Sequence, residues 1–217
     1  MSAYLLGNDV VDLDDPDSRD IQNDSRFLSR VFTDTERASI AAADVHAHRR
    51  AWTLWAAKEA AYKALLPARS ELVWSPLAFA VEPEGNGEDA EAGATGEVAS
   101  GHVRHADGDR LAFSVHGTSG YLHVICVGRV TSSAACLPLA PGSAGIIHAC
   151  EPLPPGRDES TAVRELAVAL FTRIQGVGAL QVTGDIPRFV RDGRPVDAPL
   201  SLSHHGRYHG AAFLVPS

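Results

Sequence analysis

The sequence predicts an α+β fold made of two halves, each with a helix packed on an antiparallel sheet. Two helical segments, residues 49–66 and 159–174, stand on either side of a stretch rich in proline and small residues, 131–157. Each helix is followed by strand-like runs that end in a hairpin. Helices and antiparallel hairpins distributed in this way indicate two similar layers, and we expect the halves to cover residues 1–130 and 158–217.

Local patterns predict the first strand and the first helix. Residues 5–13 (LLGNDVVDL) form an apolar run interrupted by Asp9 and Asp12, which is typical of a strand with acidic groups near its end. The sequence TDTE, which begins at Thr33, has the spacing of a capping box. We therefore expect a helix over residues 34–43.

The clearest helix in the chain spans residues 49–66. This segment is rich in Ala, Leu and Lys, contains no Gly or Pro, and is followed by a proline. Trp52, Trp55, Glu59 and Lys63 recur at three- or four-residue spacing, so the acid and the lysine share one face. A surface ion pair between Glu59 and Lys63 would explain this spacing without a catalytic role.

Strands and a loop complete the first half. We expect a strand over residues 72–81, with Pro76 at an edge or a bulge. The acidic, glycine-rich residues 82–101 are typical of a flexible surface loop. Residues 110–115 and 121–130 should form two strands of a hairpin.

The remaining segments form a linker and the second half. Residues 131–157 contain five prolines and are predicted to be an irregular linker. A helix over 159–174 and a short strand over 180–183 follow. The chain should close with a hairpin in which LSLSH and GAAFLV flank a polar turn around Gly206.

Composition limits the classes of function. The chain has 217 residues and a net charge of -8, which disfavours binding to nucleic acid or to an anionic membrane surface. No apolar run approaches the roughly 20 residues that span a bilayer, and the three scattered cysteines fit a reducing compartment. We therefore expect a soluble, cytoplasmic protein. The G-x-x-x-x-G-K-[ST] loop of ATP-splitting enzymes is absent from the sequence.

Two groups of residues have the chemistry of a metal or phosphate site. Asp9 and Glu59 could together hold Mg²⁺, which takes oxygen ligands and leaves positions for substrate phosphates, although spacing alone does not pair them. The second group could bind phosphate oxygens and comprises Ser203, His204, His205, Arg188, Arg191 and Arg194. Solvated polar side chains are the alternative for both groups.

Three linked motifs carry a resemblance to a known family. GNDVVDL, RFLSRVFTDTE and WAAKEAAYKAL follow one another between residues 5 and 66. In this order and spacing they resemble the signature series of the 4'-phosphopantetheinyl transferases. Gly7-x-Asp9 is similar to the strand-end motif of that family, and the segment from Trp55 to Lys63 is similar to its Trp-x-x-Lys-Glu-x-x-x-Lys helix. The resemblance implies the fold of that family, with two pseudo-twofold-related halves.

The resemblance also implies a reaction. Enzymes of this family move 4'-phosphopantetheine from coenzyme A to a serine of an apo acyl or peptidyl carrier protein. By this resemblance Asp9 and Glu59 bind Mg²⁺, for which Mn²⁺ could substitute, and Glu59 and Lys63 are catalytic. Coenzyme A is then expected to contact a wider set of residues, which comprises Lys63, Ser203, His204, Arg194 and Arg50. For Arg50, a solvated position at the start of the helix is the alternative.

The position of the next acidic residue after Asp9 differs from the motif of one branch of the family. Two-domain members carry an acid two positions after the strand aspartate, where this chain has Val11. The small trimeric holo-acyl-carrier-protein synthases have their acid at the position of Asp12. The resemblance therefore leaves open whether a third carboxylate or a water completes the metal site.

The second half resembles a region that precedes the Gly-x-Asp strand in two-domain members. Here it follows that strand and runs from Gly193-Arg194-Pro195, in place of Gly-Lys-Pro, to the Ser203-His204 strand. This order predicts a circularly permuted pseudodimer that is a monomer. A single-half synthase with an insertion, which would form a trimer, is the alternative.

The carrier protein is the implied partner, and its docking cannot depend on net charge because carrier proteins are usually acidic. Arg26, Arg30 and Arg37 are candidates for a local basic patch, with ordinary surface arginines as the alternative. Two other functions remain open at this stage. One is a non-catalytic module that binds coenzyme A or a carrier protein, and the other is a Mg²⁺-dependent hydrolase of pyrophosphates similar to coenzyme A.

Overall fold

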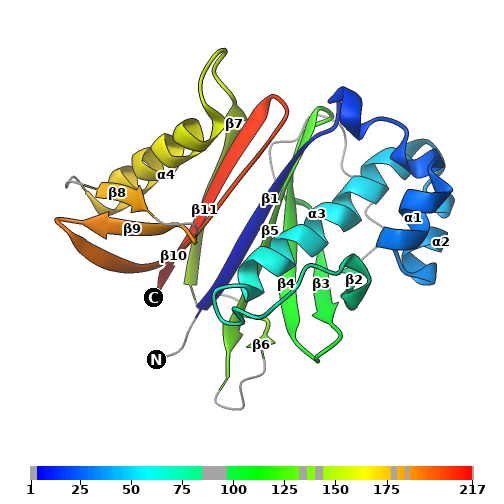
Figure 1. Ribbon diagram of the computed structural model, residues 1–217, viewed down its shortest axis with the longest axis horizontal. Helices are drawn as coiled ribbons and strands as arrows, with labels where there is room; N and C mark the ends of the chain where they lie inside the picture. Colours follow the sequence, from blue (N-terminus) through cyan, green and yellow to red (C-terminus); the bar gives the residue numbers. More distant parts are fainter. Residues whose placement is uncertain are drawn as a thin grey trace.

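Two antiparallel sheets lie side by side in the computed structural model, and each carries one long helix (Figure 1). The structure describes residues 4–84, 97–131, 136–139, 144–176, 180–183 and 186–216. The predicted α+β class and its two helix-on-sheet halves are confirmed. Within these residues, no helix is both long and apolar enough to cross a membrane.

The first half is built around the helix α3. Its sheet has the order β1-β5-β4-β3-β2, and the short strand β6 pairs with β5. Its strands and α-helices are β1 (Tyr4–Asp12), α1 (Ser25–Val31), α2 (Asp34–Ala42), α3 (Ala47–Leu65), β2 (Phe79–Glu84), β3 (Glu97–His105), β4 (Arg110–Gly117), β5 (Tyr121–Val130) and β6 (Cys136–Leu137). Its 3₁₀ helices are Pro16–Ser18, Ile21–Asn23, Asp44–His46 and Pro76–Ala78.

The second half repeats this topology. Its sheet has the order β7-β11-β10-β9-β8, which is the first sheet's order when strands are counted within each half. Its elements are β7 (Ala144–Pro152), α4 (Glu159–Gln175), β8 (Leu180–Thr183), β9 (Arg188–Arg191), β10 (Arg194–His205) and β11 (Tyr208–Pro216). In each half, an edge strand precedes the long helix and four strands of the shared order follow it, to which the first half adds β6.

Helix α3 lies unusually close to β1 because both elements present small residues where they meet. The helix buries the alanines at 51, 56, 57, 60, 61 and 64 completely. At Gly7 of β1, a Cβ atom would lie 1.9 Å from the carbonyl oxygen of Ala60. No side chain fits at this crossing, so a glycine is required there. The close approach brings one face of α3 next to Asp9.

A buried ion pair holds α3 to its other neighbours. Lys58 Nζ lies 2.7 Å from Glu36 Oε2, and both side chains are almost completely buried. Lys58 also donates to backbone carbonyl oxygens before α2 and around the start of β2, at Val31, Pro76 and Phe79. Glu36 accepts further bonds from the amides of Thr33 and Val81, the first of which confirms the predicted capping box. The pair therefore fixes α2, α3 and β2 relative to one another.

The two halves meet along β1, which lies beside β10 and β11 (Figure 1). Part of the contact is apolar and buries a cluster that comprises Leu6, Ile125, Val127, Ala212 and Leu214. Tyr121 and Tyr208, which begin β5 and β11, have ring centroids 4.7 Å apart. Residues from both sheets thus share one continuous contact.

Three histidines lie in this contact as well. His148 of β7 has its ring centroid 4.2 Å from that of His116 and 5.5 Å from that of His123. His123 is completely buried, and its Nε2 forms a hydrogen bond with the side-chain nitrogen Nδ2 of Asn8. Burial, together with the neighbouring histidines, lowers the pKa of His123 to about 3 and that of His148 to about 4. These imidazoles are therefore neutral at neutral pH.

The free energy of unfolding should fall when the pH is lowered from neutral. A histidine that is freed by unfolding takes up a proton near pH 6.5, whereas folded His123 does so only near pH 3. Its contribution to stability is fully present above pH 6.5 and is lost as the pH falls toward 3. Urea unfolding at pH 7.5 and pH 5 should show a loss from His123 of about 2 kcal/mol at the lower pH.

Replacement of His123 by Gln should reduce this loss, because Gln keeps an acceptor for Asn8 and does not titrate. Replacement of the exposed His46 by Gln is the matched control and should leave the pH dependence unchanged. An equal loss in the wild type and in the His123 variant would contradict the assignment.

Several predicted boundaries differ from the structure. The predicted linker 131–157 contains β7, because its prolines flank the strand or end it and leave the interior able to pair with β11. The second half therefore begins before residue 158. The predicted strand 72–81 is wrong in its first part, where a 3₁₀ helix at Pro76–Ala78 precedes β2. The predicted loop 82–101 is wrong at both ends, which belong to β2 and β3, and residues 85–96 lie outside the described residues.

Candidate active site

Asp9 lies at the centre of a polar contact between α3 and the second half. Lys63 Nζ is 2.8 Å from Asp9 Oδ1 and 3.3 Å from Ser203 Oγ. The Ser203 hydroxyl donates to the same Asp9 oxygen over 3.0 Å and accepts the amide of Val10 over 3.1 Å. A carboxylate, an ammonium and a hydroxyl from three elements therefore meet at one point. Of the three, only Ser203 comes from the second half.

Glu59 stands one helical turn before Lys63. No hydrogen bond or ion pair within the described residues reaches its carboxylate. Burial, together with repulsion from Asp9, raises the pKa of Glu59 to about 7, and the charge of Lys63 opposes this shift. The predicted surface pair between Glu59 and Lys63 is therefore not what holds the lysine, which pairs with Asp9 across 54 positions of sequence. Among the described residues, Glu59 is therefore a carboxylate of the site that forms no hydrogen bond.

Side chains of β10 accept hydrogen bonds from the backbone N–H groups on the outer edge of β1, and these bonds hold Ser203 in place. The amides of Asn8, Val10 and Asp12 donate to Ser201 Oγ, Ser203 Oγ and His205 Nδ1, respectively. Their distances are 2.9, 3.1 and 3.0 Å. We call these three bonds the β1–β10 ladder. Alternate residues of a strand face the same side, so positions 201, 203 and 205 all face β1.

A family model matches the segment of the chain that contains most of the candidate site. The model described as the 4'-phosphopantetheinyl transferase superfamily matches residues 5–125, which is more than half of the chain. The chain belongs to this superfamily. Phosphopantetheine transfer is the general activity of its members, which use coenzyme A, a divalent metal and carrier proteins. A comparison with curated proteins finds no match. The matched segment contains Asp9, Glu59 and Lys63, whereas Ser203 lies outside it.

The residues expected to contact coenzyme A do not gather at one point. His204 faces away from Ser203, and its Nδ1 lies 2.8 Å from Glu159 Oε2 at the start of α4. Arg194 is exposed at the beginning of β10. Arg50 directs its Nε toward Ser39 Oγ on α2, at 3.4 Å. Coenzyme A is a long molecule, so residues that lie far apart can each contact a different part of it.

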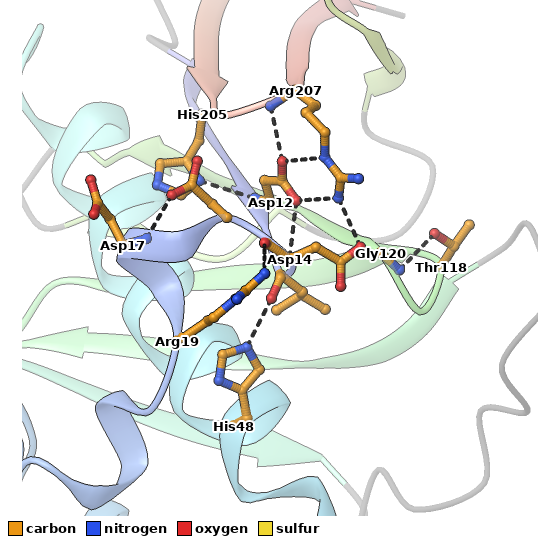
Figure 2. Close-up of polar contacts among 11 residues, drawn as sticks. Asp12, Asp14, Asp17, Arg19, His48, Thr118, Gly120, His205 and Arg207 are labelled. Atoms are coloured by element: carbon orange, nitrogen blue, oxygen red, sulfur yellow. Dashed lines mark hydrogen bonds and ion pairs between the residues drawn. The ribbon is translucent and has the colours of Figure 1, made fainter.

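Asp12 does not join Asp9 and Glu59. Its carboxylate accepts hydrogen bonds from the backbone amide and from the guanidinium of Arg207, as Figure 2 shows. These hydrogen bonds, opposed by burial, lower the pKa of Asp12 to about 2. In a strand, residues 9 and 12 point to opposite faces. Asp12 is therefore unavailable as a third carboxylate beside Asp9.

The remaining donors can be tested against the divalent metal of the superfamily. No cluster of three or more His, Cys, Asp or Glu side chains suited to a metal occurs within the described residues. Asp9 and Glu59 remain, and repulsion from Asp9 adds to burial in raising the pKa of Glu59. A divalent cation between them would relieve this repulsion. Two carboxylates fit Mg²⁺, which commonly takes one or two carboxylates and fills its other positions with water and substrate phosphates.

Some residues that shape the site were not expected from the sequence. Ser201 and Arg207 were not singled out, and Lys58 was noted only as part of a motif. The alternation in SLSHH signals that positions 201, 203 and 205 share a face, so this part of the ladder could have been found. The bond from Arg207 to Asp12 joins residues 195 positions apart, and no sequence pattern indicates it.

Proposed function

We propose that the protein transfers 4'-phosphopantetheine from coenzyme A to a serine of an apo acyl or peptidyl carrier protein. The products are the holo carrier protein and adenosine 3',5'-bisphosphate. The observation that carries this proposal is the meeting of Asp9, Glu59 and Lys63 within the segment that the superfamily model matches. These are the acids and the lysine that phosphoryl transfer requires for positioning and for charge neutralisation.

Each residue has a distinct task in this proposal. Asp9 and Glu59 hold Mg²⁺, or Mn²⁺ in its place, which when bound neutralises charge on the pyrophosphate oxygens. Lys63 moves from Asp9 to the transferred phosphate as a point charge. Glu59 accepts the proton of the carrier serine, directly or through a water. Burial and repulsion from Asp9 raise its pKa, and a bound cation would favour the ionised carboxylate that accepts this proton.

Recognition of coenzyme A uses residues of the second half. Nε2 of His204 is available to the adenosine 3'-phosphate, since Nδ1 faces Glu159. Arg194 stands at the start of β10, at the opposite end of the strand from His204, so it meets a different part of coenzyme A or none. Ser203 orients Lys63. Arg50 lies about 20 Å from Lys63 along α3, so it meets a different phosphate group or none.

The test is intact mass spectrometry of a panel of apo carrier proteins after incubation with the protein, coenzyme A and Mg²⁺. We expect one carrier class to gain one phosphopantetheine, and we expect the gain to disappear with a chelator and with Asp9→Asn. Calorimetric binding of coenzyme A without any gain would favour the non-catalytic binding module. Release of phosphopantetheine to water without a carrier would favour the hydrolase.

Replacing Arg30 with Glu should raise the KM for the carrier protein. Arg26 and Arg30 are exposed on α1, whereas Arg37 pairs with Asp34 and donates to Phe32 O. An acidic partner that docks on α1 would meet the first two arginines, and reversal of one charge should raise KM about tenfold. The measurement is initial rate against carrier concentration at saturating coenzyme A.

Arg129→Glu is the matched control, because Arg129 is exposed on β5 and lies on a different element. An unchanged KM in the Arg30 variant would remove α1 from the docking surface.

We also propose that the protein is a monomer whose halves are permuted relative to two-domain members. Ser203 reaches Asp9 within one chain, so no second copy is needed to complete the contact. Sedimentation equilibrium in the presence of coenzyme A should give the mass of one chain. A trimer would support the single-half alternative.

A further inference from the structure

We propose that Arg207 is a positioning residue of the active site, because it anchors the β10–β11 turn on Asp12 and so keeps Ser203 at Asp9 and Lys63. The inference rests on the proposed function for its kinetic part only. Arg207 touches neither Asp9 nor Lys63, and its side-chain hydrogen bonds go to Asp12 and Asp14, at and just beyond the end of β1. It would therefore act through the β1–β10 ladder.

Arg207 and Asp12 form a bidentate ion pair. Arg207 Nε lies 2.8 Å from Asp12 Oδ2, and Nη2 lies 2.7 Å from Oδ1, which is the bidentate arrangement of a guanidinium on a carboxylate. The Arg207 amide donates to Asp12 Oδ2, and Nη2 also reaches Asp14 Oδ2 at 2.8 Å. Figure 2 shows the guanidinium between these two acids. Asp12 is completely buried, so this charge requires its partner.

The turn that carries Arg207 can approach Asp12 only because it contains Gly206. This residue has a φ of +54°, and a Cβ there would lie 2.6 Å from Asp12 Oδ2. A positive φ together with this close contact favours glycine strongly. The turn is therefore shaped for contact with the end of β1.

The anchored turn is continuous with the ladder that ends at the active site. His205, two positions before Arg207, accepts the Asp12 amide, and Ser203, two positions earlier, accepts the Val10 amide. The Ser203 hydroxyl then touches Asp9 and Lys63. Without the bidentate contact, the end of β10 next to the turn would be the first part of the strand to separate from β1. Ser203 would then be less well fixed against the two residues that act on the phosphate.

The experiment compares Arg207→Met with the wild type by two independent measurements. Residue-resolved hydrogen exchange should show the amides of Val10 and Asp12 exchanging about tenfold faster, while amides in the middle of α3 keep their rates. At a temperature where both proteins are fully folded, the KM for coenzyme A should rise or kcat should fall by about fivefold. A purely structural role would leave both kinetic constants unchanged under these conditions.

Two further variants make the test specific. Arg207→Lys keeps the charge but not the bidentate geometry. Its exchange rates and kinetic constants should therefore lie between those of Arg207→Met and those of the wild type. The Lys variant also serves if the Met variant does not fold. Arg129→Met, an exposed arginine on β5, should match the wild type throughout.

Unchanged exchange at Val10 and Asp12 would overturn the inference. Faster exchange with unchanged kinetics would overturn the positioning role. If the wild type modifies no carrier, the proposed function fails, and the exchange measurement alone decides whether Arg207 anchors the turn.

Discussion

Replacing Glu59 with Gln should lower kcat for carrier modification by about a thousandfold, within the range expected for loss of a general base. The change keeps the size of the side chain and removes one of the two carboxylates beside Lys63. Stability should stay the same or increase, because the Glu59 carboxylate has no hydrogen-bond partner within the described residues and is repelled by Asp9. Initial rates by mass spectrometry and the urea midpoint are the two measurements.

The combination of lost activity and retained stability is what identifies a functional carboxylate. Glu71→Gln is the matched control, because Glu71 is exposed beyond the end of α3 and should affect neither quantity. If Glu59→Gln retained more than about a tenth of the wild-type kcat, the assignment of Glu59 as proton acceptor and metal ligand would be wrong.

Replacing Lys58 with Met should lower the free energy of unfolding by about 3–5 kcal/mol, the usual cost of removing one partner of a buried ion pair. Glu36 would remain buried with its charge, and the carbonyl oxygens of Val31, Pro76 and Phe79 would each lose a donor. The measurement is urea unfolding at pH 7, in which the midpoint should fall at an unchanged slope.

A double variant separates the ion pair from the other contacts of Lys58. Combining Lys58→Met with Glu36→Gln removes the unpaired charge, so it should recover part of the loss. Arg129→Met is the control for loss of a positive charge at an exposed position. A loss below about 1 kcal/mol in the Lys58 variant would show that the pair is not a principal contact of α3.

Local sequence signals were sufficient where one element carried its own pattern. Helix α3 was predicted within a few residues, because an alanine-rich stretch without Gly or Pro has few other conformations. The capping box likewise located the start of α2. Strand β7 was missed, since its prolines suggested a linker although only Pro152 lies within the strand, at its end. Pairing with β11, which no local pattern reports, decides its conformation.

The sequence named residues of the candidate site but not the contacts between them. The resemblance brought together Asp9, Glu59 and Lys63, and the structure places them at one point. Spacing along α3 paired Lys63 with Glu59, whereas tertiary contact pairs it with Asp9. The resemblance assigned both Ser203 and His204 to coenzyme A, whereas the alternation of a strand sends the two side chains to opposite faces. Contacts between distant segments therefore account for most of what the sequence could not show.

The position of the β1–β10 ladder between the halves has a consequence for how the protein could be divided. Asp9, Glu59 and Lys63 belong to one half and Ser203 to the other, and the chain passes between the halves once, after β6 and before β7. If the chain were cut there, each fragment would carry part of the site, and activity would return only when the fragments met in solution. The reaction rate would then report the affinity of one half for the other, as in a split-enzyme complementation assay.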